Sequence, residues 1–154
     1  MHALRHPSLY SALPLAAVLL SGCVVFPKQN VNDATQLSGC LPFPNCVSSE
    51  SGSPIHRFEP MTLAMPIAQA WPEIIIAVTD LPNTNITHQE GYYLYAKSYS
   101  ELFRFVDFVE VLADPETGVV HVRSSSLLGL SDLGVNRHRV EQLHENLIAR
   151  GVVR

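Results

Sequence analysis

The sequence predicts an α+β fold, a four-stranded antiparallel meander with one helix before it and one after it, both packed on one face. Three observations lead to this prediction. Apolar residues recur every three or four positions in two separate segments, as they do along one face of a helix. Four runs between these segments are rich in β-branched and aromatic residues. The links that join the four runs are short and carry turn residues.

The first helix is expected in the stretch AMPIAQAWPEIIIAVTDLPNT, whose apolar period runs from Ile67 to Val78. We place it at residues 71–81, with Pro72 in the first turn, where a missing backbone N–H costs little. A kink at Pro72 is the alternative. The second helix is expected at residues 137–150, with Asn136 as its N-cap and Gly151 as its end.

The four strands are expected at residues 85–89, 92–99, 102–112 and 119–126. The stretch DPETG, residues 114–118, has the composition of a hairpin turn. Tyr93, Tyr95 and Tyr99 share a parity, so their rings point to one face of their strand. If the helices cover the other face, these rings form an aromatic patch. That patch is either open to solvent or to a partner, or covered by the returning segment 40–60.

The N-terminal residues 1–22 have the pattern of a secretory signal peptide. Arg5 is the fixed charge before an apolar run of 12 residues, which is too short to span a bilayer. The run ends in Leu-Ser-Gly-Cys, which resembles the lipobox of bacterial lipoproteins. We therefore expect Cys23 to be acylated and to become the N-terminus of the mature protein. An ordinary cleaved signal with an incidental cysteine is the alternative.

An acylated Cys23 predicts a location in the bacterial cell envelope, because several acyl chains hold a protein firmly on a bilayer. Val24, in place of Asp, resembles the sorting pattern for the outer membrane, facing the periplasm, in a Gram-negative host. Residues 23–39 are polar and without period, so we interpret them as a tether. Residues 40–154 then form a single domain.

Charge argues against nucleic acid as a partner. Removal of Arg5 leaves 9 basic side chains against 14 acidic ones, and no basic run is present. The expected partners are the membrane, through the acyl chains, and an envelope protein. No motif in the sequence indicates a cofactor.

The two remaining cysteines, Cys40 and Cys46, lie in the stretch CLPFPNCVSS. A disulfide between them is expected, because the chain is predicted to be exported to an oxidising compartment. Two free thiols are the alternative. A zinc site is disfavoured because the chain has no C-x-x-C motif and no histidine follows at the usual spacing.

Charged residues on the predicted strands form a candidate polar site. Asp107 and Glu110 are separated by an odd number of positions, so they lie on opposite faces, and one of them needs a partner on the apolar side. Arg123, on the hairpin partner, is the obvious candidate, and the register decides which carboxylate it meets. The pair serves either to fix the register or, through Arg123, to bind a ligand. Asp132, Asn136 and Arg137 cluster where the last strand meets the last helix.

We find no catalytic set and no metal set. The stretch HVRSSS lacks the sharp elbow of a serine nucleophile, and His121 is about 13 Å along the strand from Ser125. His138, Glu141 and His144 stand three apart, but the two histidines are separated by about 9 Å of helical rise, which favours a solvated face.

Three stretches together, CLPFPNCVSS, FRFVDFVEV and HVRSSSLLGLSDLGVNRHRVE, resemble a bacterial and plastid family called domain of unknown function 1499. The resemblance covers about residues 40–150 and implies no known activity. Its matched polar positions are Asp107, Glu110, Arg123, Ser124, Ser131, Asp132, Gly134, Asn136, Arg137 and Arg139. The sequence departs from the family pattern at Tyr95, Lys97, Phe108, Leu127 and Leu130, so polar chemistry that depends on those positions is missing.

The leading interpretation is a non-catalytic, lipid-anchored envelope protein that acts by binding or scaffolding. Whether the protein is an enzyme stays open. One alternative is a hydrolase that uses the sheet carboxylates and Arg123 in a cleft. The other is a carrier of a small apolar ligand, with a cavity between helices and sheet.

Overall fold

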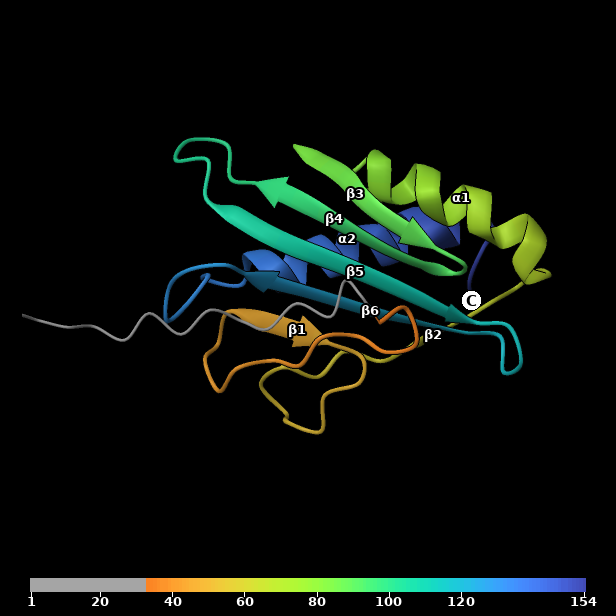
Figure 1. Cartoon of the computed structure of the whole chain (residues 1–154), viewed down its shortest axis with the longest axis horizontal. Coiled ribbons are helices and arrows are strands. Elements are labelled where there is room, and N and C mark those ends of the chain that lie inside the picture. Colours follow the sequence, from red (N-terminus) through yellow and green to blue (C-terminus); the bar gives the residue numbers. More distant parts are fainter. Residues whose placement is uncertain (1–32) are drawn as a thin grey trace, which may run out of the picture.

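A computed structural model describes residues 33–154 of the chain. The predicted signal peptide, Cys23 and most of the predicted tether lie outside the described residues. The described part is an α+β domain with one antiparallel sheet and two helices (Figure 1). Its elements are β1 (Cys46–Ser48), β2 (Met61–Thr62), α1 (Ile67–Thr79), β3 (Thr84–Glu90), β4 (Tyr93–Tyr99), β5 (Val106–Asp114), β6 (Val119–Ser126) and α2 (Val135–Ala149).

The sheet contains the predicted four-stranded meander, β3 to β6, and two further strands. Its order is β1-β6-β5-β4-β3, and β2 also pairs with β6, which gives six strands. Both added strands come from the segment before α1, where we had predicted no strand. They cover the edge of β6 that a four-stranded meander would leave unpaired. The predicted hairpin between β5 and β6 is confirmed, and the Asp114 carboxylate accepts the Glu116 N–H across the turn at 2.8 Å.

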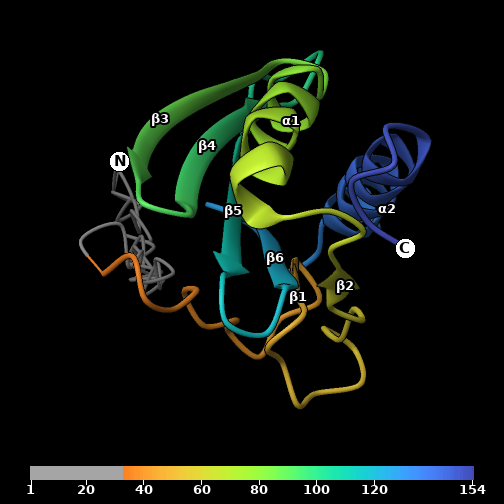
Figure 2. The ribbon, with the colours of Figure 1, turned by 90° about the vertical axis from the view of Figure 1, so that its right-hand side faces the viewer.

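Both helices pack on one face of the sheet, as the sequence predicts (Figure 2). The core between the two layers is apolar and closely filled, and burial of this surface is the main driving force for the fold. Its largest fully buried apolar side chains are Met61, Ile74, Val78, Leu94, Val109, Val111, Val120, Leu143 and Leu147.

Helix α1 begins four residues earlier than we predicted. It starts at Ile67, after Pro66, and Pro72 lies inside it. A proline within a helix removes one backbone hydrogen bond, which is unfavourable. Here Pro72 is on the exposed face, while Ala70, Trp71 and Ile74 are buried against the sheet. Burial of the apolar face therefore outweighs the lost bond.

Helix α2 confirms the predicted end and corrects the predicted start. At its end, Gly151 has φ of +69° and its N–H donates to Ile148, while the Val152 N–H donates to Leu147, which is a Schellman motif. At its start, Asn136 is not the cap. The Asp132 carboxylate accepts the backbone N–H of Asn136 at 2.8 Å, and the Asn136 side chain points inward.

Strand β5 starts at Val106, four residues later than predicted. Residues 100–105 form a turn in which the Ser100 hydroxyl accepts the Phe105 N–H at 2.9 Å. Arg104 has φ of +55°, a left-handed conformation that ends any strand running through it. Leu102, Phe103 and Phe105, which we had assigned to the strand, are exposed in this turn.

The face of the sheet opposite the helices is covered by residues 34–40, which we call the strap. Leu37 is buried against Tyr93, Tyr95 and Phe108. The folded domain thus includes Leu37 and Ser38, residues that we had assigned to the tether. It also means that Tyr93 and Tyr95 form no open aromatic patch, and that the strap covers them. The predicted disulfide between Cys40 and Cys46 is present and ties the end of the strap to β1.

Candidate functional site

The candidate polar residues are divided between the two faces of the sheet. Glu110 and Arg123 lie on the strap face, whereas Asp107 and Asn136 lie on the helix face. This agrees with the parity of Asp107 and Glu110 in the sequence. The candidates therefore form two separate networks.

On the strap face, Glu110 and Arg123 form a fully buried ion pair. The register places them directly opposite each other on β5 and β6, and Arg123 Nη1 donates to Glu110 Oε2 at 2.5 Å. The other carboxylate oxygen accepts three hydrogen bonds, from the Ser38 N–H at 3.1 Å, the Ser38 hydroxyl at 2.8 Å and the Tyr93 hydroxyl at 2.9 Å. Glu110 thus joins the strap to the sheet.

The two buried tyrosines keep their protons. Burial, and then the charge of Glu110, raise the pKa of Tyr93 far above its usual value. The same two causes raise the pKa of Tyr95. A phenol that holds its proton is a donor, which is the role that Tyr93 plays toward Glu110.

Arg123 has a second edge that Glu110 does not reach. Its Nε and Nη2 atoms are buried without a hydrogen-bond partner among residues 33–154, and so is the Ser125 hydroxyl. A buried guanidinium is costly unless a counter-ion compensates it. In the described part of the chain, the only ion pair of Arg123 is with Glu110. The stability of the strap face therefore depends strongly on the ion pair between Arg123 and Glu110.

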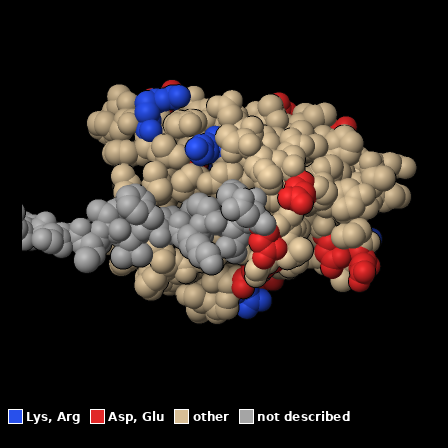
Figure 3. Space-filling view, viewed as in Figure 1, with Lys and Arg blue, Asp and Glu red and all other residues tan. Residues whose placement is uncertain are grey.

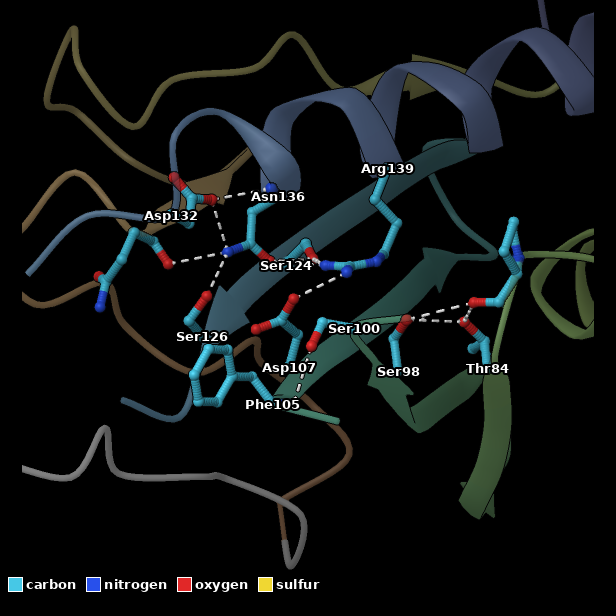
Figure 4. A network of polar contacts seen from close by, with 12 residues as sticks. Thr84, Ser98, Ser100, Phe105, Asp107, Ser124, Ser126, Asp132, Asn136 and Arg139 are labelled. Carbon is cyan, nitrogen blue, oxygen red and sulfur yellow. Dashed lines mark hydrogen bonds and ion pairs between the residues drawn. The ribbon is translucent and has the colours of Figure 1, made fainter. Parts of the chain in front are cut away.

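On the helix face, the Asn136 side chain is the centre of the second network (Figure 4). Its carbonyl oxygen accepts the Ser124 hydroxyl at 2.6 Å. Its amide group donates to the Ser126 hydroxyl at 2.9 Å, to the Asp132 carboxylate at 2.7 Å and to the Asn45 carbonyl at 3.1 Å. A single buried amide thus connects α2, β6, the loop before α2 and the residue before β1.

Arg139 extends this network to β5. Its Nη2 donates to Asp107 Oδ2 at 2.7 Å, and its Nη1 donates to the Asn136 carbonyl oxygen at 2.8 Å and to the Ser124 hydroxyl at 3.0 Å (Figure 4). The Arg139 and Asp107 side chains are 10% and 7% exposed. Both charges are therefore neutralised inside the fold.

Arg137 belongs to neither network. Its guanidinium donates to the Arg57 carbonyl at 3.0 Å, on the loop between β1 and β2. This contact holds the loop against the start of α2.

The arrangement provides no nucleophile next to a base in the stretch that drew attention in the sequence. The His121 ring contacts the Ser49 hydroxyl at 3.4 Å, and not the serines that follow it on β6. That hydroxyl also accepts the Val122 N–H at 2.9 Å, so Ser49 serves as a backbone partner for β6. Within residues 33–154, no three His, Cys, Asp or Glu side chains are arranged to hold a metal ion.

The hollows that the structure describes lie at the surface. One of about 490 Å³ lies between the strap and the β1–β2 loop and is lined by Ser38, Glu50 and His56. Another, of about 320 Å³, lies where α2 meets the end of β4 and is lined by Tyr99, His138 and Arg139. Glu110 and Arg123 line neither of them.

Sequence reasoning missed Ser38, Asn45 and Tyr93 as members of the networks. Ser38 and Asn45 lie in segments without periodicity, so no pattern assigns their side chains to the sheet. Tyr93 could have been found, because it pairs with Leu112 on β5 and so lies on the same face of the sheet as Glu110. The hydrogen bond to Glu110 lies diagonally across that pair of strands, within reach of a long aromatic side chain.

Comparison with family models matches residues 36–147 to a protein of unknown function, DUF1499. No curated protein and no solved structure matches the chain. None of the helices in residues 33–154 is long and apolar enough to cross a membrane.

Proposed function

The chain belongs to the family of proteins of unknown function DUF1499, and we propose that it is a lipid-anchored cell-envelope protein that acts by binding or scaffolding and not by catalysis. One observation carries the proposal. The polar residues that stand out in the sequence are used in internal hydrogen bonds on two opposite faces of the sheet. Asp107, Glu110, Arg123 and Asn136 are buried, and their internal bonds stabilise a rigid module.

The sequence supports the location. The signal pattern, the lipobox before Cys23 and the polar segment after it are those of an exported lipoprotein. The Cys40–Cys46 disulfide is consistent with an oxidising compartment outside the cytosol. In a Gram-negative host, Val24 favours the outer membrane, with the domain facing the periplasm.

The two alternatives have less support. A hydrolase that uses Asp107, Glu110 and Arg123 would need them in one cleft, and the sheet separates Asp107 from the other two. A carrier of an apolar ligand would need a cavity between helices and sheet, where the described side chains form a filled core.

The anchor is tested by mass spectrometry of the protein purified from membranes. The native chain should begin at an acylated Cys23. The Cys23→Ser variant should lose the acyl chains and appear in the soluble fraction. Ser21→Ala is the matched control, because it keeps a small residue next to the cleavage site and should remain acylated. A full-length, unacylated native chain would refute the anchor.

The binding role is tested by photo-crosslinking in the native envelope. Ile55, Ile76 and Ile148 are exposed apolar residues on three different parts of the domain. A photo-reactive residue is placed at each of these positions in turn. At least one of the three should crosslink reproducibly to one protein. Recovery of lipid alone from all three positions would count against a protein partner.

A further inference from the structure

Large exposed apolar side chains gather at one end of the domain. We call this group the apolar end. It consists of Leu102, Phe103, Phe105, Leu128, Leu130, Leu133 and Val135, which are between 47% and 95% exposed. Single exposed apolar residues are common on protein surfaces, but a group of this size usually marks an interaction surface.

The register of the sheet explains why these residues are neighbours. The first three lie in the β4–β5 connection, the three leucines that follow them lie in the β6–α2 connection, and Val135 is the first residue of α2. Tyr99 pairs with Val106, and Asp107 pairs with Ser126, so both connections leave the same end of the sheet. Both lie at the left end of the domain in Figure 1.

The backbone holds these side chains outward. Arg104 and Leu133 both have φ of +55°, a left-handed conformation that side chains other than glycine rarely adopt. Phe103 and Phe105 stack on each other with ring centroids 5.5 Å apart, and the core does not enclose either ring. These connections therefore present apolar groups at a cost in backbone strain that core packing does not offset.

Charge distinguishes the two ends of the sheet. The turns at the opposite end carry Glu90, Asp114 and Glu116, all acidic. The connections at the apolar end carry Arg104, Glu101 and Asp132, a net charge of −1 against −3 at the opposite end. In Figure 3, two basic groups lie toward the left of the visible face, one of them beside an acidic group, and most acidic groups lie toward the middle and right, with one basic group among them at the bottom. Approach to an anionic phospholipid surface thus favours the apolar end over the opposite end.

We propose that the apolar end inserts into the headgroup region of the phospholipid leaflet that carries the protein, an inference that rests on the proposed acyl anchor at Cys23. Ten residue steps lead from Cys23 to Asp33, and they span at most about 33–36 Å. The chain enters the domain at the opposite end of the sheet, where Ala34 and Thr35 line a hollow with Asp114. From Asp114 back to the start of β5 at Val106 is eight residue steps, or about 27 Å, which is less than that reach. The anchor and the apolar end can therefore reach the same bilayer.

Such an insertion fixes how the domain stands on the membrane. Aliphatic and aromatic side chains would lie about 5–10 Å into the boundary between headgroups and acyl chains, with the sheet rising away from the surface. The acidic turns, with Glu90 and Asp114, would then lie farthest from the bilayer, available to a partner in the compartment.

The test uses fluorescence quenching by brominated acyl chains. The acylated full chain is reconstituted into vesicles of phosphatidylethanolamine and phosphatidylglycerol, with and without bromine on the acyl chains. Trp71 is the only native tryptophan and is buried in the core, so it supplies a constant background. Phe105→Trp and Leu130→Trp place a probe on each connection of the apolar end. Glu116→Trp is the matched control, in an exposed turn at the opposite end of the sheet.

Both probes at the apolar end should emit further to the blue in vesicles and lose much of their emission to bromine, whereas Glu116→Trp should lose none. Equal quenching at the two ends in anchored protein would overturn the insertion and leave the anchor intact. A blue shift that grows with protein density, without quenching, would assign the end to a second copy and would also overturn it. Sedimentation of the vesicles reports the anchor separately: protein left in the supernatant refutes the anchor and, with it, this orientation.

Discussion

Substitution of Arg123 by methionine removes the cation of the buried ion pair and keeps a side chain of similar length. In the native protein Arg123 and Glu110 are both fully buried, and their charged groups are 2.5 Å apart. After the substitution, Glu110 keeps its bonds from Ser38 and Tyr93 but loses its counter-ion. The folded state then contains a buried carboxylate without a cation.

The loss of one partner from a buried ion pair typically costs about 3–5 kcal/mol. A domain of this size has a total stability of about 5–15 kcal/mol, so the variant should lose a large part of it. With a urea dependence of about 1–3 kcal/mol per molar, the midpoint of unfolding should fall by about 1–5 M. Arg123→Lys should lose roughly half as much or less, because it keeps the charge and removes the two unpartnered nitrogens.

Urea unfolding followed by circular dichroism measures both variants against a matched control. Arg57→Met is that control, since Arg57 pairs with Glu59 at 3.0 Å on the surface, with side chains 61% and 75% exposed. It should change the free energy of unfolding by less than about 1 kcal/mol. If Arg123→Met falls in the same range as Arg57→Met, the pair does not hold the strap face together and the reasoning is wrong.

Three further predictions concern the strap, the disulfide and the helix-face network. Burial raises the pKa of Tyr93 and Tyr95, so above pH 10.0, their unfolded value, the unfolded chain loses protons that the folded protein keeps. Stability should therefore fall as the pH rises beyond this value, and the phenolate absorbance of these two residues should appear only with unfolding. Replacement of Cys40 and Cys46 by serine should lower the free energy of unfolding by roughly 2 kcal/mol, measured in urea, because the crosslink closes a short loop. Asn136→Ala should lower it by about 2–3 kcal/mol, measured by thermal unfolding, since several buried groups lose their partner.

Each of these has an outcome that would contradict it. Complete formation of phenolate in the folded protein would show that Tyr93 and Tyr95 are open to solvent. Reduction of the native disulfide should lower the free energy of unfolding by as much as the serine substitutions do. If reduction leaves that free energy unchanged, the disulfide does not stabilise the fold. Glu145→Ala, on the exposed face of α2, should change stability by less than about 0.5 kcal/mol, and an equal effect at Asn136 would refute the network.

The meander could be predicted because its longer strands are rich in β-branched and aromatic residues and its turns carry Asp, Pro and Gly. Strands β1 and β2 could not, because they contain three and two residues and show no period. They form because the edge of β6 offers unpaired backbone groups, which is a property of the assembled sheet. We placed the start of α1 too late because we assigned Pro72 to the first turn of the helix. The apolar period around it, which begins before this proline, was the better guide.

The ion pair illustrates how far sequence reasoning reaches at the candidate site. Parity alone separates Asp107 from Glu110, but only the register shows that Arg123 faces Glu110, and a slip of one residue would reverse that. We predicted Asn136 as the N-cap because asparagine is common at that position. Asp132, four residues earlier, is instead the side chain that accepts a backbone N–H at the start of the helix. The part played by Ser38 depends on the path of the strap, for which the sequence contains no periodic signal.

If the proposed acyl anchor holds the protein by its N-terminal side, the strap has a mechanical consequence. Any pull on the chain from that side arrives first at Leu37 and Ser38, and so at the centre of the sheet and not at a loose end. The strap can detach from the sheet only as far as Cys40, because the disulfide to Cys46 transmits the force to β1 and from there to β6. The strands would then be loaded along their length, so that many backbone hydrogen bonds share the force.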